Sequence, residues 1–418
     1  MTLLLALLAC GISSPSPAPP DPDDLDQVPG RFQTVTEAPD DDLEALIALG
    51  YLDGTRPPPN ASGARVIAAD KIAPGANLYV SGQGPEAHLI DRDGNILHKW
   101  AYDWFDKFTS NSKRDKEFPN HWRRAHLYEN GDLLVIWGGK GMAKLDKNSR
   151  FLWGTDRQAI HHDVDVAPDG SVWTLSREPT LIPELTDHRV VMDTVLVYEP
   201  NGRLREKFSI ADCFLDSEFQ VEMNRFQKRG DVLHTNTLSI LPEGFSRPEF
   251  KAGNLLVSFR HANLLATIDP QKHTVEWVLR GEWAAQHQPV LLSDQTVLLF
   301  DNRGLKTRSR VLEADTLTGR IGWQYGAEDG EYFWSRILGS VQRLPNGNTL
   351  ISESDNGRAF EITRSGERVW EFVNPYRAGS EDQFIASLYE LVRLPPDFDL
   401  SWADPSTAAR SVKATSRR

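Results

Sequence analysis

Three histidines, one arginine and one tyrosine recur at matched positions along the chain. Each stands seven residues before a turn residue, or nine where one copy has a longer turn; they are Arg123, His162, His234, His287 and Tyr389. Neutral imidazole is nucleophilic near pH 7, and guanidinium or imidazolium groups stabilise negative charge that spreads over oxygens. These side chains therefore predict a site that binds and transfers an anionic group. The reaction would be phosphoryl transfer or, by analogy, sulfuryl transfer.

Two other interpretations of the histidines stay open at this point. A histidine at the start of a strand is most often a structural hydrogen-bond partner, although three at matched positions favour a function. The second interpretation is a zinc ion bound by the three histidines. An arginine at a matched strand position would repel a metal ion, so we expect no metal. The remaining imidazoles at less regular positions are expected to be structural; they are His88, His126, His261 and His273.

Neighbours of the matched histidines suggest how their rings are oriented. Asp163 follows His162, and Gln286 precedes His287. Each of these side chains is expected to orient the adjacent imidazole without itself contacting the substrate. His161 is either a second ligand of the site or a surface residue.

A sequence repeat with a period of 40 to 50 residues must position these side chains. Trp277, Trp323 and Trp370 close similar phrases at spacings of 46 and 47 residues, and Trp100 and Trp153 close related ones. Short strands with this period are typical of a β-propeller. The clearest copy spans 339–375, with expected strands at 340–344, 348–353, 358–363 and 368–372. Further copies lie at about 123–153, 161–210, 234–279 and 286–326.

The two ends of the repeat complete each other. Residues 77–100 hold only three expected strands, at 77–81, 87–91 and 96–100, and lack an innermost strand. Residues 388–395 (LYELVRLP) echo 338–345 (LGSVQRLP). Because a closed ring leaves no open sheet edge, we predict an all-β, six-bladed propeller over residues 64–400, with its first blade closed by a C-terminal strand.

The residues before the repeat read as an export signal and a tether. The apolar run at 3–9 predicts a signal peptide over residues 1–9, and Leu7-Leu8-Ala9-Cys10 predicts a lipid anchor on Cys10. The Pro- and Asp-rich segment 10–63 predicts a solvated tether, with one short helix at 40–51. We expect a disordered basic tail at 401–418 and a buried, inert thiol at Cys213.

Composition excludes several classes. The chain carries 46 Lys and Arg against 59 Asp and Glu, a net charge of −13, which argues against a nucleic-acid binder. No apolar run is long enough to span a bilayer as a helix, so the lipid anchor is the one membrane contact that we expect. Two cysteines exclude a disulfide scaffold.

The chain resembles bacterial arylsulfotransferases in a series of short motifs. The resemblance covers about residues 76–395, the whole predicted propeller, and the order of the motifs along the blades makes it specific. In chain order they are Leu89–Gly94 with Trp100, His161-His162-Asp163 with Pro168-Asp169-Gly170, Leu233-His234-Thr235-Asn236, Ser258-Phe259-Arg260-His261, and Gln286-His287 with Phe300-Asp301-Asn302.

The resemblance implies roles for individual residues. His287 matches the histidine that becomes transiently sulfated, His162 and His234 match those that hold and activate the donor sulfate, and Arg260 matches the arginine that binds sulfate oxygens. Substrate contacts are expected from a second set: His161, Arg123, Asn302 and Tyr389. The resemblance implies no cofactor. The chain departs from longer family members because it has a tether where they have a dimerisation domain, and it lacks their disulfide.

We therefore expect an exported, membrane-tethered enzyme that moves a sulfuryl group from an aryl sulfate to a phenol. The transfer needs no nucleotide and passes through a sulfohistidine in two steps. Two alternatives remain: a non-catalytic, surface-tethered binding propeller, and a metal-dependent hydrolase or lyase on the same scaffold.

Overall fold

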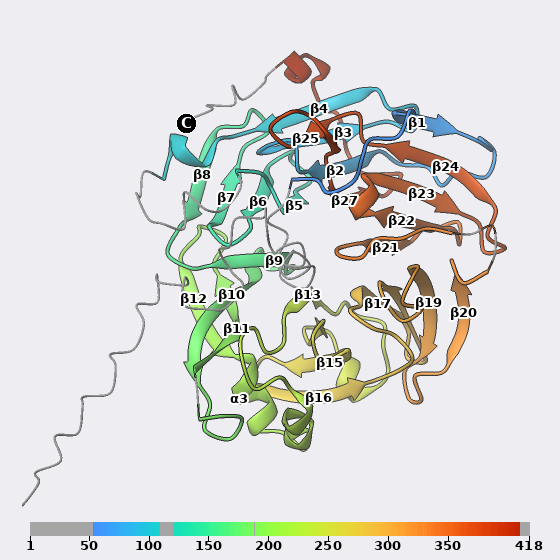
Figure 1. Ribbon diagram of the computed structural model, residues 1–418. Coiled ribbons are helices and arrows are strands. Elements are labelled where there is room, and N and C mark those ends of the chain that lie inside the picture. The colour runs from blue at the N-terminus through green and yellow to red at the C-terminus, as the bar shows by residue number, and fades with distance from the viewer. Residues whose placement is uncertain (1–52, 109–119, 188, 329, 331, 410–418) are drawn as a thin grey trace, which may run out of the picture.

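Six four-stranded blades surround a central axis in the computed structural model, which describes residues 53–108, 120–187, 189–328, 330 and 332–409 (Figure 1). All pairings between consecutive strands within a blade are antiparallel. The predicted six-bladed β-propeller is thus confirmed. The predicted signal peptide, Cys10, most of the tether and the helix at 40–51 lie outside the described residues, as does the end of the tail.

Each blade is numbered from its innermost strand outward. Blade 2 is β5 (Arg124–Leu127), β6 (Leu133–Trp137), β7 (Gly141–Leu145) and β8 (Phe151–Thr155). Blade 3 is β9 (Ile160–Val166), β10 (Val172–Leu181), β11 (Arg189–Tyr198) and β12 (Leu204–Ser209). Blade 4 is β13 (Thr235–Ile240), β14 (Leu255–Phe259), β15 (Leu264–Asp269) and β16 (Thr274–Leu279).

The remaining blades contain both ends of the described chain. Blade 5 is β17 (His287–Ser293), β18 (Thr296–Asp301), β19 (Arg310–Asp315) and β20 (Ile321–Tyr325). Blade 6 is β21 (Ser340–Arg343), β22 (Thr349–Glu353), β23 (Arg358–Ile362) and β24 (Arg368–Val373), extended by β1 (Gly63–Val66). Blade 1 is β27 (Leu388–Arg393), β2 (Asn77–Ser81), β3 (Glu86–Ile90) and β4 (Ile96–Ala101).

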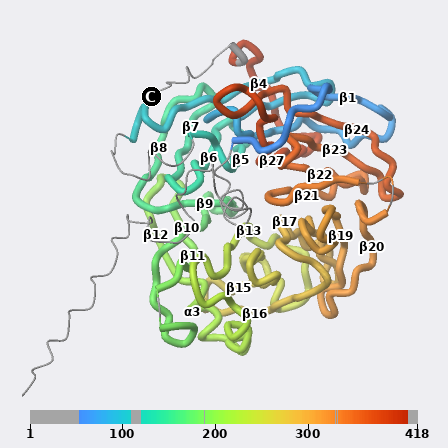
Figure 2. The backbone as a smooth tube through the Cα atoms, viewed as in Figure 1, coloured from blue at the N-terminus to red at the C-terminus, as the bar shows by residue number. Residues whose placement is uncertain are grey.

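Blade 1 therefore joins two distant parts of the sequence. Strand β27 pairs with β2 from Asn77 opposite Arg393 to Ser81 opposite Leu388. The N-terminal and C-terminal parts of the described chain lie side by side here (Figure 2). β27 holds the place nearest the axis that β5, β9 and β13 hold in other blades.

Burial explains why the strands have different sequence patterns. The second strands β6, β14 and β22 are buried along their whole length and read as continuous runs such as LLVIW. Outer strands such as β16 and β20 alternate between more and less buried residues because one face meets solvent. This arrangement leaves polar side chains at the inner strand starts free to face the axis.

Four of the repeated tryptophans fasten a blade to the next one by a hydrogen bond, and the buried indole Nε1 of Trp153 has no such partner among the described residues. The indole Nε1 of Trp100 on β4 donates to the carbonyl of Gly131, in a turn of blade 2. The equivalent indoles make the same kind of bond: Trp277 to Thr316, Trp323 to Arg364 and Trp370 to Arg92. The period seen in the sequence is therefore the period of the contacts between blades.

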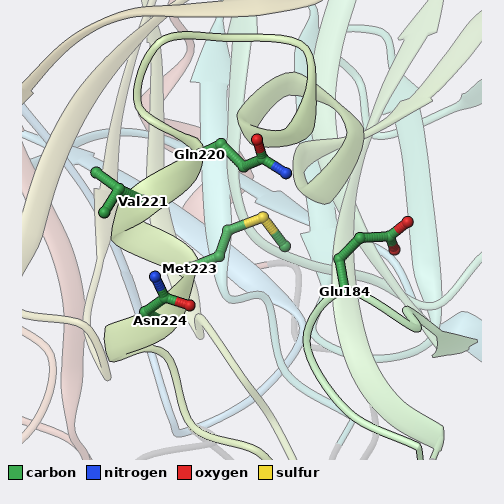
Figure 3. A pocket seen from close by; sticks show the side chains of 5 residues that line it. All are labelled: Glu184, Gln220, Val221, Met223 and Asn224. Atoms are coloured by element: carbon green, nitrogen blue, oxygen red, sulfur yellow. The ribbon is translucent and has the colours of Figure 1, made fainter.

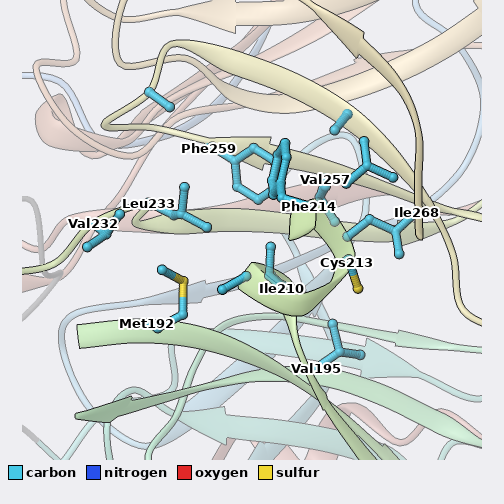
Figure 4. Packing of buried hydrophobic residues seen from close by; sticks show 14 of the residues in the cluster. Met192, Val195, Ile210, Cys213, Phe214, Val232, Leu233, Val257, Phe259 and Ile268 are labelled. Atoms are coloured by element: carbon cyan, nitrogen blue, oxygen red, sulfur yellow. The ribbon is translucent and has the colours of Figure 1, made fainter. Parts of the chain in front are cut away.

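The largest apolar cluster lies between blades 3 and 4, where α3 (Ile210–Leu215) packs (Figure 4). Ile210, Cys213 and Phe214 of this helix meet Val195 of β11 and Phe259 of β14 within it. The Cys213 thiol is buried, and burial raises its pKa to about 12. The expected burial of the Cys213 thiol is confirmed.

The segments flanking the propeller contact it. The backbone N–H of Ser387 donates to the Asp53 carbonyl, and Arg56 Nε lies 3.3 Å from Asp355 Oδ2, so the end of the segment assigned to the tether lies against the ring. The first part of the predicted tail also packs on it: Trp402 donates to the Glu129 carbonyl, and Thr407 accepts from Lys99 N–H. These two contacts place Trp402 and Thr407 against the ring. Within the described ranges, no helix has the length and hydropathy that a membrane crossing requires.

Candidate functional site

A small pocket on the propeller axis gathers residues from all six blades. Four of the predicted site residues line it, one from each of four blades: Tyr389 from blade 1, Arg123 beside blade 2, His162 from blade 3 and His287 from blade 5. The other lining residues are Arg124, Asn236, Thr237, Gln288, Leu338 and Gly339. The lining is therefore mostly polar and contains two guanidinium groups and two imidazoles.

The backbone bends sharply where the inner strands begin. His162, His234 and Gln288 have φ angles of 59°, 51° and 46°, and Leu338 before β21 has 57°. This left-handed region is unfavourable for residues with a Cβ, and such strain concentrates at functional sites. Its recurrence at one level of four blades shows that these side chains are held in fixed directions near the pocket.

His287, the first residue of β17, has its tautomer fixed by two acceptors. Its Nδ1 lies 2.8 Å from Asn302 Oδ1 and 3.0 Å from the Ala285 carbonyl oxygen. The Asn302 amide is itself fixed, because its Nδ2 donates to the carbonyls of Ser335 and Leu338. Nδ1 therefore carries the proton, and the lone pair of His287 is on Nε2. An imidazole in this form is ready to act as a nucleophile.

His287 stays neutral across the ordinary pH range. Burial, followed by the positive charge of Arg260, lowers its pKa to about 3. Since only the neutral ring has a free lone pair, the site keeps His287 in its nucleophilic form.

His162 lies against a second imidazole and an arginine. Its Nδ1 is 2.6 Å from Nδ1 of His161 and 3.4 Å from Nη2 of Arg177. Arg177 is buried and also contacts two carboxylates, Asp193 Oδ1 at 3.4 Å from Nε and Asp231 Oδ2 at 3.3 Å from Nη1. Burial and the Arg177 charge lower the pKa of His162 well below its usual value. His161 is thus a buried neighbour of the pocket and not a surface residue.

His234 completes the group of imidazoles without lining the pocket. Its ring centroid is 4.8 Å from that of His162 and 4.7 Å from that of His261. Its Nδ1 lies 2.7 Å from Asp231 Oδ2. Burial, then Arg177, lowers the pKa of His234 well below its usual value, so it is neutral.

One group of described residues has the spacing of a cation site: Asp231, His234 and His261. Arg177 already places a positive charge 3.3 Å from Asp231 Oδ2. His261 Nδ1 also points to the Asp231 carbonyl oxygen at 2.7 Å. These contacts account for the group as a hydrogen-bonded cluster around a guanidinium. His261, predicted to be structural, belongs to it.

Two arginines supply positive charge near His287. Arg260 follows β14, is 8% exposed, and its backbone N–H donates to the His234 carbonyl. Its charge contributes to lowering the pKa of both His287 and His234. The Arg123 guanidinium lies over the Tyr389 ring, 5.2 Å from the centroid, and burial lowers its pKa to about 10, so it remains charged at pH 7.

The two residues predicted to orient imidazoles do something else. Asp163 Oδ1 lies 2.7 Å from Arg124 Nε, and its Oδ2 accepts from the backbone N–H of Leu238, so it joins blades 2, 3 and 4. Gln286 donates to Ser258 Oγ and to the carbonyls of blade 4. These contacts hold both side chains, and none of them involves the adjacent imidazole. Asn302, expected to contact substrate, holds His287 instead.

Sequence reasoning missed several residues around the pocket. Arg124 binds Glu390 Oε1 at 2.6 Å and Gln288 Oε1 at 2.9 Å, which links three blades at the pocket. Arg177 and Asp193 are buried charges within mostly apolar strands, and Asp231 is a partly buried charge before β13. Arg177 comes two residues after the mostly apolar run 172–175 on β10. A charged residue inside a buried strand was the sequence feature that could have marked it as part of the site.

A second hollow lies on the outside of blade 3, away from the axis. Gln220, Val221, Met223 and Asn224 of η3 (Gln220–Arg225) face Glu184 across it (Figure 3). It contains no histidine or arginine among its lining residues. The chemistry predicted from the sequence therefore belongs to the axial pocket.

Comparisons with known proteins show one family match and several similar solved structures. The family model described as arylsulfotransferase (ASST) matches residues 124–375, more than half of the chain. No curated protein matches this chain. A solved protein of unknown function from Bacteroides caccae is 14% identical over 76% of this chain and 98% of its own, with a TM-score of 0.48. Virginiamycin B lyase from Staphylococcus aureus is 11% identical over 60% of this chain and 69% of its own, with a TM-score of 0.37.

Proposed function

The chain belongs to the arylsulfotransferase (ASST) family, and on that basis we propose that it transfers a sulfuryl group from an aryl sulfate to a phenol. The observation that carries the proposal is the state of His287: buried, neutral, protonated on Nδ1 by its contact with Asn302, and lining the axial pocket. This is the state that a nitrogen nucleophile requires.

In the first step, His287 Nε2 attacks the sulfur of the donor. The bond from sulfur to the aryl oxygen breaks as the bond from sulfur to Nε2 forms, and the leaving oxygen takes a proton held by the imidazoles of the site, so that a phenol is released. Asn302 Oδ1 accepts from Nδ1–H throughout, so it stabilises the positive charge that develops on the ring. The product is a sulfohistidine.

Negative charge on the sulfuryl oxygens is met by the basic groups around the pocket. Arg260 and Arg123 supply guanidinium charge, and His162 and His234 supply imidazoles in a buried setting, where such interactions are strong. Arg123 supports this role because its guanidinium has no ion pair among the described residues and lies against Tyr389.

In the second step, a phenol takes the place of the first product. Its oxygen loses a proton to an imidazole and attacks sulfur, and the bond from sulfur to His287 Nε2 breaks. The enzyme returns to its starting state. Each partner is a small molecule, and the route requires neither a nucleotide nor a cofactor.

A turnover assay on the full chain tests the proposal. The donor is 4-nitrophenyl sulfate, the acceptor is phenol, and a chelator is present without nucleotide. Nitrophenol release that depends on phenol, and its loss in His287→Gln, are the expected results. Release without phenol would indicate a sulfatase, and activity restored by zinc would indicate a metal-dependent hydrolase or lyase. Stable donor binding without turnover by a folded sample would indicate a binding module.

Export and lipidation of Cys10 form part of the proposal. Their support is the apolar run at 3–9 followed by Leu7-Leu8-Ala9-Cys10. Such an anchor would place the propeller outside the cytoplasm, at the end of a Pro- and Asp-rich tether. Labelling of cells with a radioactive fatty acid should mark the wild-type chain and leave Cys10→Ser unmarked. Equal labelling would remove the lipid anchor.

A further inference from the structure

His161 and His162 share a short contact that the transfer steps above leave unexplained. Their Nδ1 atoms are 2.6 Å apart, which requires one proton between them, because two lone pairs or two N–H groups would repel at that distance. Two further groups flank the pair. Asp193 Oδ1 lies 3.2 Å from His161 Nε2, and Arg177 Nη2 lies 3.4 Å from His162 Nδ1.

A neutral pair of imidazoles cannot satisfy both flanking groups. If His162 carries the shared proton, His161 has its other proton on Nε2 and meets Asp193 well, but Arg177 then faces an N–H. If His161 carries the shared proton, Arg177 faces a lone pair as it should, but Asp193 then faces the lone pair of His161 Nε2. Each arrangement leaves one buried repulsive contact.

One added proton removes the conflict. His161 is then protonated on both nitrogens, donating to His162 Nδ1 and facing Asp193 with Nε2–H. His162 accepts from His161 and Arg177 through Nδ1, and it carries its own proton on Nε2. All three contacts are favourable in this state. The pair of imidazoles thus has two states, which differ by one proton.

We propose that His161, His162 and Asp193 form a proton store that serves both half-reactions of the transfer. The inference rests on the proposed function, since it gives the phenolic proton a place to stay between the two steps. His162 exchanges the proton with substrate, because it lines the pocket; His161 and Asp193 act behind it as positioning and storage groups.

The proton balance of the cycle is complete. In the first step, the leaving phenolate oxygen takes the proton from His162 Nε2, and the shared proton moves from His161 to His162, so that both rings become neutral. In the second step, the acceptor hydroxyl gives its proton to His162 Nε2, and the shared proton returns to His161. Over one turnover, the proton of the acceptor phenol replaces the one given to the leaving phenol.

The charges around the pair tune this exchange. Arg177 touches it from β10, Asp193 from β11, Asp231 and His234 lie at the start of blade 4, and Arg123 acts from blade 2. Burial and Arg177 lower the pKa of His161, and Asp193 opposes them. A loaded pair is therefore a stronger acid than free imidazole, as protonation of a leaving phenolate requires.

Donors with different leaving groups test the store. 4-Nitrophenolate leaves readily without a proton, whereas 4-methylphenolate needs one. His161→Asn keeps a donor near His162 Nδ1 but cannot pass on a proton, and Asp193→Asn removes the carboxylate charge while keeping its shape. Both variants should lose on the order of 10²-fold in kcat/KM with 4-methylphenyl sulfate, and less than about 10-fold with 4-nitrophenyl sulfate.

A matched control and a clear contrary outcome complete the experiment. His126→Asn removes a half-buried imidazole of β5 that does not line the pocket, and it should change both donors little. Equal losses with both donors in His161→Asn and Asp193→Asn would overturn the proton store. If one variant fails to fold, the other decides. Absence of phenol-dependent transfer in the wild type with either donor would instead refute the proposed function.

Discussion

The side-chain amide of Asn302, directly after the second strand of blade 5, fixes the protonation of His287 at the start of the first strand of the same blade. Its Oδ1 is 2.8 Å from His287 Nδ1, while its Nδ2 donates to the Ser335 and Leu338 carbonyls in the segment that leads into blade 6. Rotation of the amide would place Nδ2 against His287 and lose both backbone bonds. The backbone that leads into blade 6 therefore decides which nitrogen of the blade 5 histidine is the nucleophile.

Asn302→Leu should lower kcat/KM for the donor by on the order of 10²-fold, because the ring loses the acceptor that holds its tautomer. Asn302→Asp keeps an acceptor at this place but adds a negative charge that stabilises the protonated ring. We expect it to be active at pH 8 and to lose activity at a higher pH than the wild type as the solution is acidified. Rates of nitrophenol release over pH measure both effects, and wild-type behaviour of Asn302→Leu would contradict the assignment.

The pH dependence of the first step should show the lowered pKa of His287. For a histidine with the ordinary pKa of about 6.5, the neutral fraction would fall about 25-fold between pH 7.0 and pH 5.0. Since burial and Arg260 lower the pKa of His287 to about 3, the neutral form persists over this range. With 4-nitrophenyl sulfate, kcat/KM for the donor should therefore stay nearly constant between these pH values while the protein remains folded. A fall that follows a pKa near 6.5 would show that His287 is not shifted.

Loss of either arginine near the sulfuryl group should be costly. Arg260→Ala and Arg123→Ala should each reduce kcat/KM for the donor by on the order of 10²-fold, as expected for a lost partner of a developing oxyanion. Arg203→Ala is the control, because Arg203 is an exposed residue of blade 3 whose side chain is 70% accessible. Rates for the two site variants equal to that of Arg203→Ala would place the sulfuryl oxygens elsewhere.

Acid should destabilise the fold partly through His88. Burial lowers the pKa of this imidazole to about 3, so below pH 6.5 the unfolded chain binds a proton that the folded chain does not. The stabilising effect of neutral His88 is therefore present above pH 6.5 and is lost as the pH falls toward 3. Between pH 7 and pH 5 this amounts to about 2 kcal/mol. Urea unfolding should show a smaller decrease for His88→Gln than for the wild type, and equal decreases would contradict it.

The sequence was informative wherever a pattern repeats. The tryptophan spacing predicted six blades because four of these indoles bond to a turn of the next blade, so the contact has the period of the fold. The matched positions of His162, His287, Arg123 and Tyr389 predicted one shared pocket, since equivalent strand starts meet at the axis.

Residues outside the repeat pattern could not be found in this way. Arg177 and Asp193 occupy interior positions of β10 and β11, where the alternation of a buried strand gives no sign of which polar residue faces a histidine. The roles of Asp163 and Gln286 were misjudged because adjacency in sequence does not show which neighbouring group a side chain contacts. Only the spatial arrangement of three blades shows that Asp163 binds Arg124 and Leu238.

The pairing of β27 with β2 makes assembly of the site depend on the synthesis of residues 388–393. Tyr389 reaches the pocket on the same strand that closes the first blade of the ring. Until the ribosome has supplied these residues, β2 keeps an open edge, and the pocket lacks one wall. A chain released before residue 388 thus exposes an edge prone to aggregation and cannot assemble the whole site, so that activity itself reports that translation has passed this strand.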